Sequence, residues 1–161
     1  LKENSMVDYK GSCDCGQVNY SIADKPIFTQ ACHCKDCKKS TGSSFVIHST
    51  VHEDDLTING KVDSTELSTG SGTGRRVFFC TNCGTYLYCK YKIVESQRIV
   101  AIRSKTLNDS DKFPPQAHIF VKDKDPWVNL TDTKNCFDLM YDREKIWPEQ
   151  SIKKLEEKNN Q

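Results

Sequence analysis

Residues 31–37 read Ala-Cys-His-Cys-Lys-Asp-Cys, and two cysteine pairs flank this triplet in the sequence. The pairs lie in Gly-Ser-Cys-Asp-Cys-Gly (residues 11–16) and Phe-Cys-Thr-Asn-Cys-Gly (residues 79–84). Structural zinc sites are closed by four ligands, whereas catalytic zinc sites keep one open position. Two pairs make one closed four-thiolate site, and the triplet leaves one position over. The grouping therefore predicts one zinc for the fold and one for chemistry, held by Cys13, Cys15, Cys32, Cys34, Cys37, Cys80 and Cys83.

A disulfide framework is the rival interpretation of this pattern. The chain has nine cysteines, an odd number, and C-x-C neighbours lie too close together to staple distant segments. Dense disulfides belong to short secreted chains, but this one has 161 residues and shows no secretory pattern from Leu1 onward. All-thiolate tetrahedral sites suit zinc or iron–sulfur, and C-x-C does not match the usual ferredoxin spacings. We therefore expect zinc, and a reducing compartment such as the cytoplasm or the nucleus.

The composition bounds the class of protein. The hydrophobic fraction is 36%, a modest core for one domain of this length, which fits a fold that relies on metal. The net charge is +1, from 23 basic and 22 acidic residues, so bulk charge gives no reason to expect nucleic acid or an anionic membrane as a partner. No apolar run approaches the roughly 18 residues of a membrane span.

Short strand patterns dominate the chain. In residues 17–22 the apolar and polar side chains alternate, which places Val18, Tyr20 and Ile22 on one face. Turn formers such as Asn59-Gly60 and Pro114-Pro115 separate the segments. The sequence thus predicts a mainly β architecture of small antiparallel sheets pinned by zinc, with further strands over residues 45–48, 76–79, 85–88, 98–102 and 118–121.

Helical patterns are few. A short helical turn is expected over residues 35–41, and a terminal helix over residues 148–158 with Ile152 and Leu155 on one face. A solvated, weakly packed tail is the alternative for that last segment. We divide the chain into a zinc-binding domain, residues 1–135, and a C-terminal extension, residues 136–161. Glycine follows both Cys15 and Cys83, and we expect it to permit a tight turn and to leave its N–H directed at sulfur.

All seven cysteines in this order resemble the glutathione-dependent formaldehyde-activating enzyme family, which also contains centromere protein V. The resemblance runs from about Tyr9 to Leu130. It rests also on the residues after the cysteines, Lys-Lys-Ser-Thr-Gly at 38–42, and on two later segments, His-Ile-Phe-Val at 118–121 and Pro-Trp-Val at 126–128.

The resemblance implies a largely β "tent" fold and a division of labour between two metals. It implies a structural zinc on Cys13, Cys15, Cys80 and Cys83, and a catalytic zinc on Cys32, Cys34 and Cys37. Spacing alone leaves open which pair joins which. The resemblance also implies a carbon–sulfur lyase-class reaction, the addition of glutathione to formaldehyde to give S-hydroxymethylglutathione.

Physical chemistry agrees with a thiol substrate at the triplet. Three thiolates on Zn²⁺ leave a net charge of −1, which weakens the ion as a Lewis acid, yet the open position suits a soft thiol. An unperturbed thiol of pKa ~8.5 is only a few per cent thiolate at pH 7, and metal coordination deprotonates it. The candidates for binding glutathione and the new oxyanion are basic or hydroxyl side chains: Lys38, Lys39, Ser40, Thr41, Ser68, Thr69, Ser71, Arg75 and Arg76.

Outside the ligand set, two of the four histidines and the two remaining cysteines are of further interest. His33 sits between two ligands, so we expect it to project away from the metal. His118 lies in a predicted strand, as a core or edge histidine or as a proton carrier. Cys89 is expected to be a small buried residue, although as a fourth ligand it would close the triplet site. Cys136 carries no assignment.

Two other functions compete with the enzyme. A non-catalytic zinc scaffold that binds a protein partner needs four ligands at each zinc, or only one zinc, whereas this chain keeps all three cysteines of the triplet. A methionine sulfoxide reductase of the B type would need C-x-x-C in both structural pairs, and Cys13-Asp-Cys15 departs from that pattern.

Overall fold

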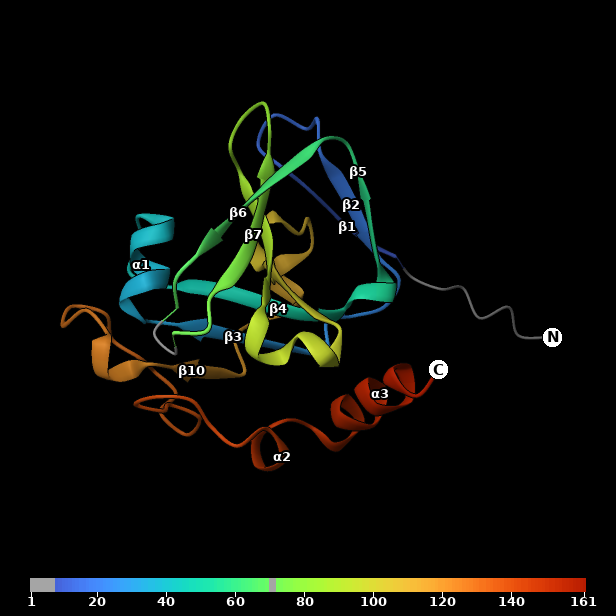
Figure 1. Ribbon diagram of the computed structural model, residues 1–161. Coiled ribbons are helices and arrows are strands. Elements are labelled where there is room, and N and C mark those ends of the chain that lie inside the picture. Colours follow the sequence, from blue (N-terminus) through green and yellow to red (C-terminus); the bar gives the residue numbers. More distant parts are fainter. Residues whose placement is uncertain (1–7, 70–71) are drawn as a thin grey trace.

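The computed structural model describes residues 8–69 and 72–161, and it confirms the mainly β prediction (Figure 1). The strands form two sheets, one of three strands in the order β1-β2-β5 and one of seven in the order β10-β3-β4-β9-β8-β7-β6. The strands are β1 (Tyr9–Ser12), β2 (Asn19–Ile22), β3 (Phe28–Cys32), β4 (Val46–His52), β5 (Leu56–Asn59), β6 (Val62–Leu67), β7 (Arg75–Cys80), β8 (Tyr86–Tyr91), β9 (Ile99–Arg103) and β10 (Ala117–Ile119).

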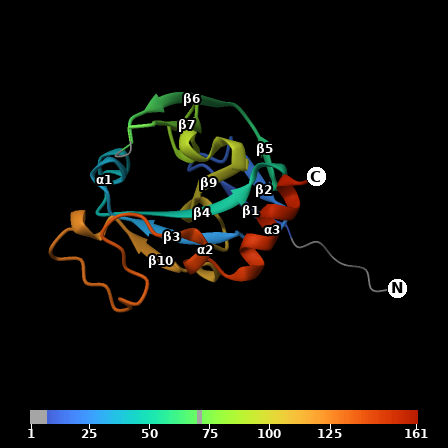
Figure 2. The same cartoon turned by 60° about the horizontal axis from the view of Figure 1, so that its bottom comes forward.

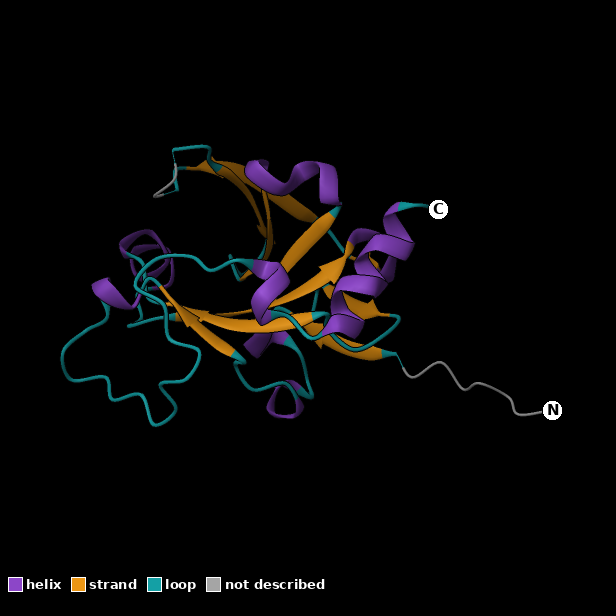
Figure 3. Ribbon diagram, turned by 90° about the horizontal axis from the view of Figure 1, so that it is seen from below, coloured by secondary structure: helices purple, strands orange, loops and turns teal. Residues whose placement is uncertain are grey.

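The described helices are short and lie around the two sheets (Figure 3). The α-helices are α1 (Lys35–Thr41), α2 (Arg143–Ile146) and α3 (Glu149–Asn159). The short 3-10 helices are η1 (Glu53–Asp55), η2 (Lys92–Gln97), η3 (Ser104–Thr106), η4 (Ser110–Lys112) and η5 (Val121–Asp123). None of the helices in residues 8–69 and 72–161 is long and apolar enough to cross a membrane.

The core lies between the two sheets. Val18, Tyr20 and Ile22 are all buried there, as their alternation predicts, and they belong to one cluster with Val51 and Leu87 of the larger sheet. Burial of such side chains contributes roughly 1.5–3 kcal/mol each to stability. The packing explains why residues 17–22 could be recognised: one polar and one buried face leave a period of two in the sequence.

Several elements lacked a clear sequence pattern. Strand β6 is a polar edge strand paired only with β7, and β3 runs directly into the cysteine triplet, so neither shows a separate alternating run. The larger sheet also contains one parallel pairing, β10 with β3. The strand expected over residues 118–121 ends early, because Phe120 adopts a left-handed backbone conformation with φ 54°.

The C-terminal segment packs against the body of the protein (Figures 1 and 2). Ile152 and Leu155 of α3 share a face, as predicted, and contact the cluster that contains Phe28. The Ser151 hydroxyl donates to the carbonyl of Ile27 at 2.6 Å, and Lys158 pairs with Asp55 at 2.7 Å. The alternative of a weakly packed, solvated tail is therefore wrong for α3.

Candidate metal centre and active site

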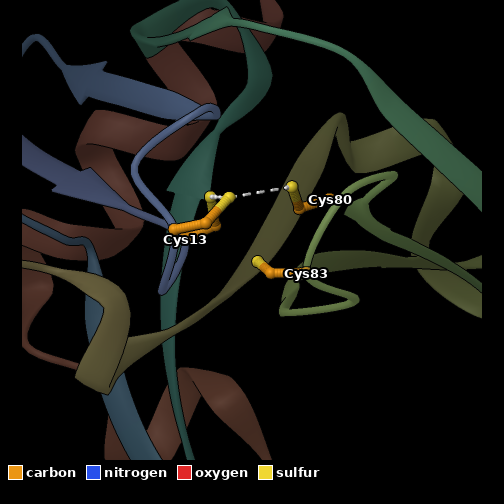
Figure 4. A group of neighbouring side chains, drawn as sticks. Cys13, Cys80 and Cys83 are labelled. Atoms are coloured by element: carbon orange, nitrogen blue, oxygen red, sulfur yellow. Dashed lines mark hydrogen bonds between the residues drawn. The ribbon is translucent and has the colours of Figure 1, made fainter.

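Cys13, Cys15, Cys80 and Cys83 form a four-sulfur cluster that joins the two sheets. Cys13 and Cys15 lie in the turn between β1 and β2, while Cys80 ends β7 and Cys83 lies in the following turn (Figure 4). All four Sγ atoms lie within 4.8 Å of one another, with Cys13–Cys15 at 3.6 Å and Cys15–Cys80 at 3.8 Å. A tetrahedral zinc with bonds of about 2.3 Å places its sulfurs about 3.8 Å apart. The donor set and its spacing therefore fit a zinc ion.

The local backbone supports this cluster. Gly16 and Gly84 both have positive φ, +77° and +74°, which an L side chain rarely adopts, so the expected tight turns are present. Their N–H groups donate to the carbonyls of Cys13 and Cys80, not to sulfur as expected. The N–H of Val18 instead reaches the sulfur of Cys13, at 3.3 Å.

Polar neighbours favour thiolates at the exposed corner of the cluster. The hydroxyl of Thr85 lies 3.1 Å from Cys83 Sγ and, with backbone N–H groups, lowers the pKa of the Cys83 thiol to about 5. The side chain of Asn82 lowers the pKa of Cys15. Thiolates are the form that binds metal, so these contacts prepare the site for a cation.

Cys32, Cys34 and Cys37 form a second, three-sulfur cluster at the junction of β3 and α1. Cys32 ends β3, Cys34 caps the N-terminus of α1, and Cys37 lies in the first turn of that helix. Their Sγ atoms lie within 4.8 Å of one another, and no fourth His, Cys, Asp or Glu among the described residues joins them. The three sulfurs thus fit a metal that keeps a position open.

Cys34 is the only thiol of this cluster whose pKa is lowered, since those of Cys32 and Cys37 are raised. Hydrogen bonds from the neighbouring thiols of Cys32 and Cys37 lower it, and the backbone N–H of Cys37 adds a further contact at 3.3 Å. Sharing a proton among close sulfurs raises the pKa of Cys32 in turn. The cluster therefore accommodates negative charge on Cys34 most readily.

The two remaining cysteines stay outside both clusters. Cys89 is fully buried and packs with Val77 and Ala101, and burial raises the pKa of its thiol. This placement confirms the expectation that Cys89 is a small buried residue and not a fourth ligand of the triplet site. Cys136 is half-buried, and its thiol donates to the carbonyl of Asp132 at 3.3 Å. All nine cysteines are free, in agreement with metal sites over a disulfide framework.

A cavity of about 240 Å³ opens beside the three-sulfur cluster. All three cysteines line it, together with His48 and Arg75. The rest of its wall is mostly apolar or aromatic: Ile93, Val94, Ile99, Val100, Ala101, Tyr91, Ile119, Phe120, Met140, Tyr141 and Trp147, with Gln30, Thr50, Thr69 and Arg143 as its polar members. A mostly apolar cavity with a few convergent polar groups is the usual form of a small-molecule site.

Two buried guanidinium groups meet at Ser40 in α1, and that of Arg75 belongs to a residue that also lines the cavity. Arg75 and Arg103 each place Nη2 3.3 Å from the hydroxyl oxygen of Ser40, and Arg103 also covers the ring of Tyr86 at 3.8 Å. In the part of the chain that the structure describes, neither forms an ion pair, and Nε of each lacks a hydrogen-bond partner. Buried donors without partners are costly, so this side of the site is suited to an anion.

His48 adds an uncharged donor or acceptor to the same wall. Its ring lies 6.3 Å from that of Tyr91, and its Nε2 has no hydrogen-bond partner among the described residues. Burial, together with the charges of Arg103 and Arg75, lowers the pKa of His48 to about 3. The imidazole is therefore neutral at physiological pH.

His33 and His118 are partners. Nε2 of His33 lies 3.0 Å from Nδ1 of His118, and neither histidine belongs to a sulfur cluster. Burial, aided by the charge of His118, lowers the pKa of His33 to about 4. His33 is fully buried and ties the triplet loop to β10, which agrees with its expected place outside the ligand set.

Only some of the other residues predicted to bind substrate lie near the cavity. Ser40 meets the two guanidinium groups, whereas Lys38 pairs with Asp125 at 2.8 Å and Lys39 is exposed. Arg76 is exposed and pairs with Glu66 at 2.8 Å. Of the other candidates, Thr69 lines the cavity, Thr41 and Ser68 are exposed, and Ser71 lies outside the described residues.

Sequence reasoning missed Arg103, His48 and the aromatic residues Tyr141 and Trp147. Arg103 and His48 occupy paired positions on β9 and β4, and both are buried. A cation or an imidazole inside an apolar strand pattern is the one signal that could have identified them. Tyr141 and Trp147 lie beyond every cysteine of the motif and carried no such signal.

Of the comparisons with known proteins, one identifies a family. A family model described as glutathione-dependent formaldehyde-activating enzyme matches residues 8–123. No curated protein matches significantly. A crystal structure described as that of a Rhodobacter sphaeroides protein is 19% identical in sequence and superposes with a TM-score of 0.48. That superposition covers 80% of this chain and 98% of the other.

Proposed function

The chain belongs to the glutathione-dependent formaldehyde-activating enzyme family, and on that premise we propose that it joins a thiol to a small aldehyde. Glutathione is the proposed thiol, and formaldehyde or a related aldehyde is its partner. The product with formaldehyde is S-hydroxymethylglutathione, formed in a carbon–sulfur lyase-class reaction. We place this activity in a reducing compartment, the cytoplasm or the nucleus.

The observation that carries this proposal is the cavity, which all three cysteines of the triplet and the buried Arg75 line together. A zinc ion bound by Cys32, Cys34 and Cys37 would supply an open position that holds an incoming thiol as thiolate at neutral pH. A cavity at an incomplete ligand set also favours an enzyme over a non-catalytic scaffold.

Arg75 has the position and chemistry to stabilise the charge that develops in the reaction. Attack by sulfur forms the carbon–sulfur bond and moves the carbonyl π electrons onto oxygen, which then accepts a proton equivalent to the one lost by the thiol. Arg75 lines the cavity, and its buried guanidinium forms no ion pair among the described residues. A preorganised donor aimed at such an oxygen lowers the barrier, and a guanidinium donates a hydrogen bond without giving up its proton.

Recognition of the two glutathione carboxylates falls to basic and hydroxyl side chains near the cavity. Lys38, Lys39, Ser40 and Arg75 remain our candidates, whereas Arg76, which is exposed and pairs with Glu66, is not assigned to the substrate. The four-cysteine site has no part in the chemistry: four thiolates close a zinc, so we assign Cys13, Cys15, Cys80 and Cys83 to the fold.

Calorimetric titration of the zinc-loaded protein with reduced glutathione tests the proposal. S-methylglutathione is the control, because it has the same carboxylates but no free thiol. We expect glutathione to bind more tightly and the protein to accelerate formation of S-hydroxymethylglutathione, followed by NMR. If neither glutathione nor its methylated form binds, glutathione is not the thiol substrate and that part of the proposal is wrong.

A further inference from the structure

The C-terminal segment forms one wall of the cavity beside the three-sulfur cluster. Met140, Tyr141, Arg143 and Trp147 all line it. These residues lie beyond residues 8–123, the range that the family model matches. One wall of the site is therefore supplied by a part of this chain outside the family match.

The wall is held in place by several independent contacts. The N–H of Phe137 donates to the carbonyl of His118 at 2.9 Å, which attaches the segment beside β10. Trp147 stacks on Phe28 with ring centroids 5.2 Å apart, and its Nε1 donates to the hydroxyl of Tyr141 at 2.8 Å. These contacts reach β3, the strand that ends at Cys32, so the wall is fixed relative to the sulfurs.

The chemistry of the cavity does not match formaldehyde alone. Ile93, Val94 and Ile99 also line the cavity, and the lining as a whole is mostly apolar. Its volume of about 240 Å³ exceeds the roughly 150 Å³ that holds a benzene molecule. Formaldehyde, with one carbon, would leave most of this space empty, and the charged groups of glutathione do not match a mostly apolar lining.

The opening of the cavity is apolar as well. Ile93 and Met140 are 64% and 54% exposed, although large exposed hydrophobic side chains are few among the described residues. Both line the cavity. The apolar lining of the cavity therefore continues to the protein surface.

We propose that the aldehyde substrate carries an apolar group about the size of a phenyl ring or a six-carbon chain, and that residues 137–147 select it. This inference rests on the proposed function. The group lies between the C-terminal wall and Ile93, Val94 and Ile99, with its carbonyl carbon toward the sulfurs. The thiol adds across the C=O bond to give a hemithioacetal, so no further reactant is needed.

The test compares two glutathione derivatives without a free thiol, S-methylglutathione and S-hexylglutathione, with hexan-1-ol as a probe of the cavity alone. The chain has two tryptophans, and Trp127 is 73% exposed, so the Trp127→Phe protein reports through Trp147 in the wall. In this zinc-loaded variant we expect S-hexylglutathione to change the fluorescence and to bind more than about tenfold tighter than S-methylglutathione.

A matched pair of further variants locates the effect. Met140→Glu places a charge at the cavity opening, whereas Leu139→Glu places it on a neighbour of similar exposure, 52%, that does not line the cavity. We expect Met140→Glu to weaken the binding of S-hexylglutathione severalfold and to leave the affinity for S-methylglutathione unchanged. Leu139→Glu should change neither affinity. Equal effects of the two variants, or equal affinities of the two derivatives, would overturn the inference.

The outcomes separate this inference from the proposed function. Glutathione-dependent turnover of formaldehyde with no preference for the hexyl derivative would retain the function and overturn the apolar selection. A different result is that hexan-1-ol changes the fluorescence of Trp147, that Met140→Glu weakens this binding, and that glutathione does not bind at all. This result would support the apolar selection and count against glutathione as the thiol.

Discussion

Arg75 and Arg76 are neighbours in β7, yet their side chains lie on opposite faces of the strand. Arg75 is 2% exposed and reaches the hydroxyl of Ser40, whereas Arg76 is exposed and pairs with Glu66. Successive side chains of a strand point to opposite faces, so one residue of register separates a cavity position from a surface position. The pair thus offers a test with its own control.

We expect Arg75→Met to lower kcat/KM for thiol addition about 10²- to 10³-fold, the usual effect of removing a preorganised donor. The fold should survive, because Arg75 has no ion-pair partner among the described residues that its loss would leave uncompensated. Arg76→Met should leave kcat/KM within about twofold. Steady-state kinetics with formaldehyde and glutathione measure both, and an Arg75→Met enzyme of full activity would remove Arg75 from the proposed mechanism.

Metal content is a second prediction. Two sulfur clusters with the right spacing lead us to expect two zinc ions per chain. Elemental analysis of protein reconstituted with excess zinc and then desalted gives the ratio directly. A value of one would mean that one of the clusters does not bind zinc.

The two clusters should differ in what they stabilise. Metal binding contributes on the order of 10 kcal/mol to folding in small zinc modules, so Cys80→Ser should lower the melting temperature sharply and release one zinc. Cys34→Ser should remain folded but lose activity.

Cys136→Ser is the control for this comparison, since Cys136 lies outside both clusters. It should match the parent protein in melting temperature, zinc content and rate. Equal losses of melting temperature in Cys80→Ser and Cys34→Ser would argue against separate roles.

The buried imidazole of His48 makes stability depend on pH. Its pKa falls from 6.5 to about 3 on folding, so above pH 6.5 the ring is neutral in both states and contributes nothing. Below pH 6.5 the unfolded chain binds a proton that the folded chain does not, and the free energy of unfolding decreases. At pH 5 this loss is about 2 kcal/mol.

His48→Gln keeps a neutral polar side chain and removes this titration. Denaturant unfolding at pH 7 and pH 5 should therefore show a loss smaller by about 2 kcal/mol in the variant than in the parent. Subtracting the two curves removes the contribution of other groups, including the cysteines. Identical losses would mean that His48 takes up its proton in the folded protein too.

Much of the fold could be predicted because its causes are local. The alternation of Val18, Tyr20 and Ile22 and the short helix over residues 35–41 depend on neighbours in sequence. The parallel pairing of β10 with β3 could not be predicted, since it brings Ala117 opposite Gln30 and leaves no periodic pattern in either segment. Non-local pairing is decided by the packing of the whole chain.

The same distinction applies to the site. The cysteines are recognisable because ligand spacing is a local property, and the structure gathers all seven into two clusters. The cavity is different, because Arg75, His48 and Trp147 meet there from three distant segments. Arg75 was distinguished from Arg76 only by the register of β7. Trp147 reaches the cavity through the packing of the C-terminal segment.

The two sulfur clusters differ in how much chain they enclose. Cys15 and Cys80 are 65 residues apart, so a metal between them closes a long loop and removes freedom from the unfolded chain, much as a disulfide does. For a loop of that length the entropic effect is about 4 kcal/mol on the disulfide scale. Cys32 and Cys37 belong to one short segment and enclose almost nothing. A metal at the triplet would therefore constrain little of the chain, whereas a metal on the four-cysteine cluster would add a cross-link between the two sheets, beside the core that already joins them.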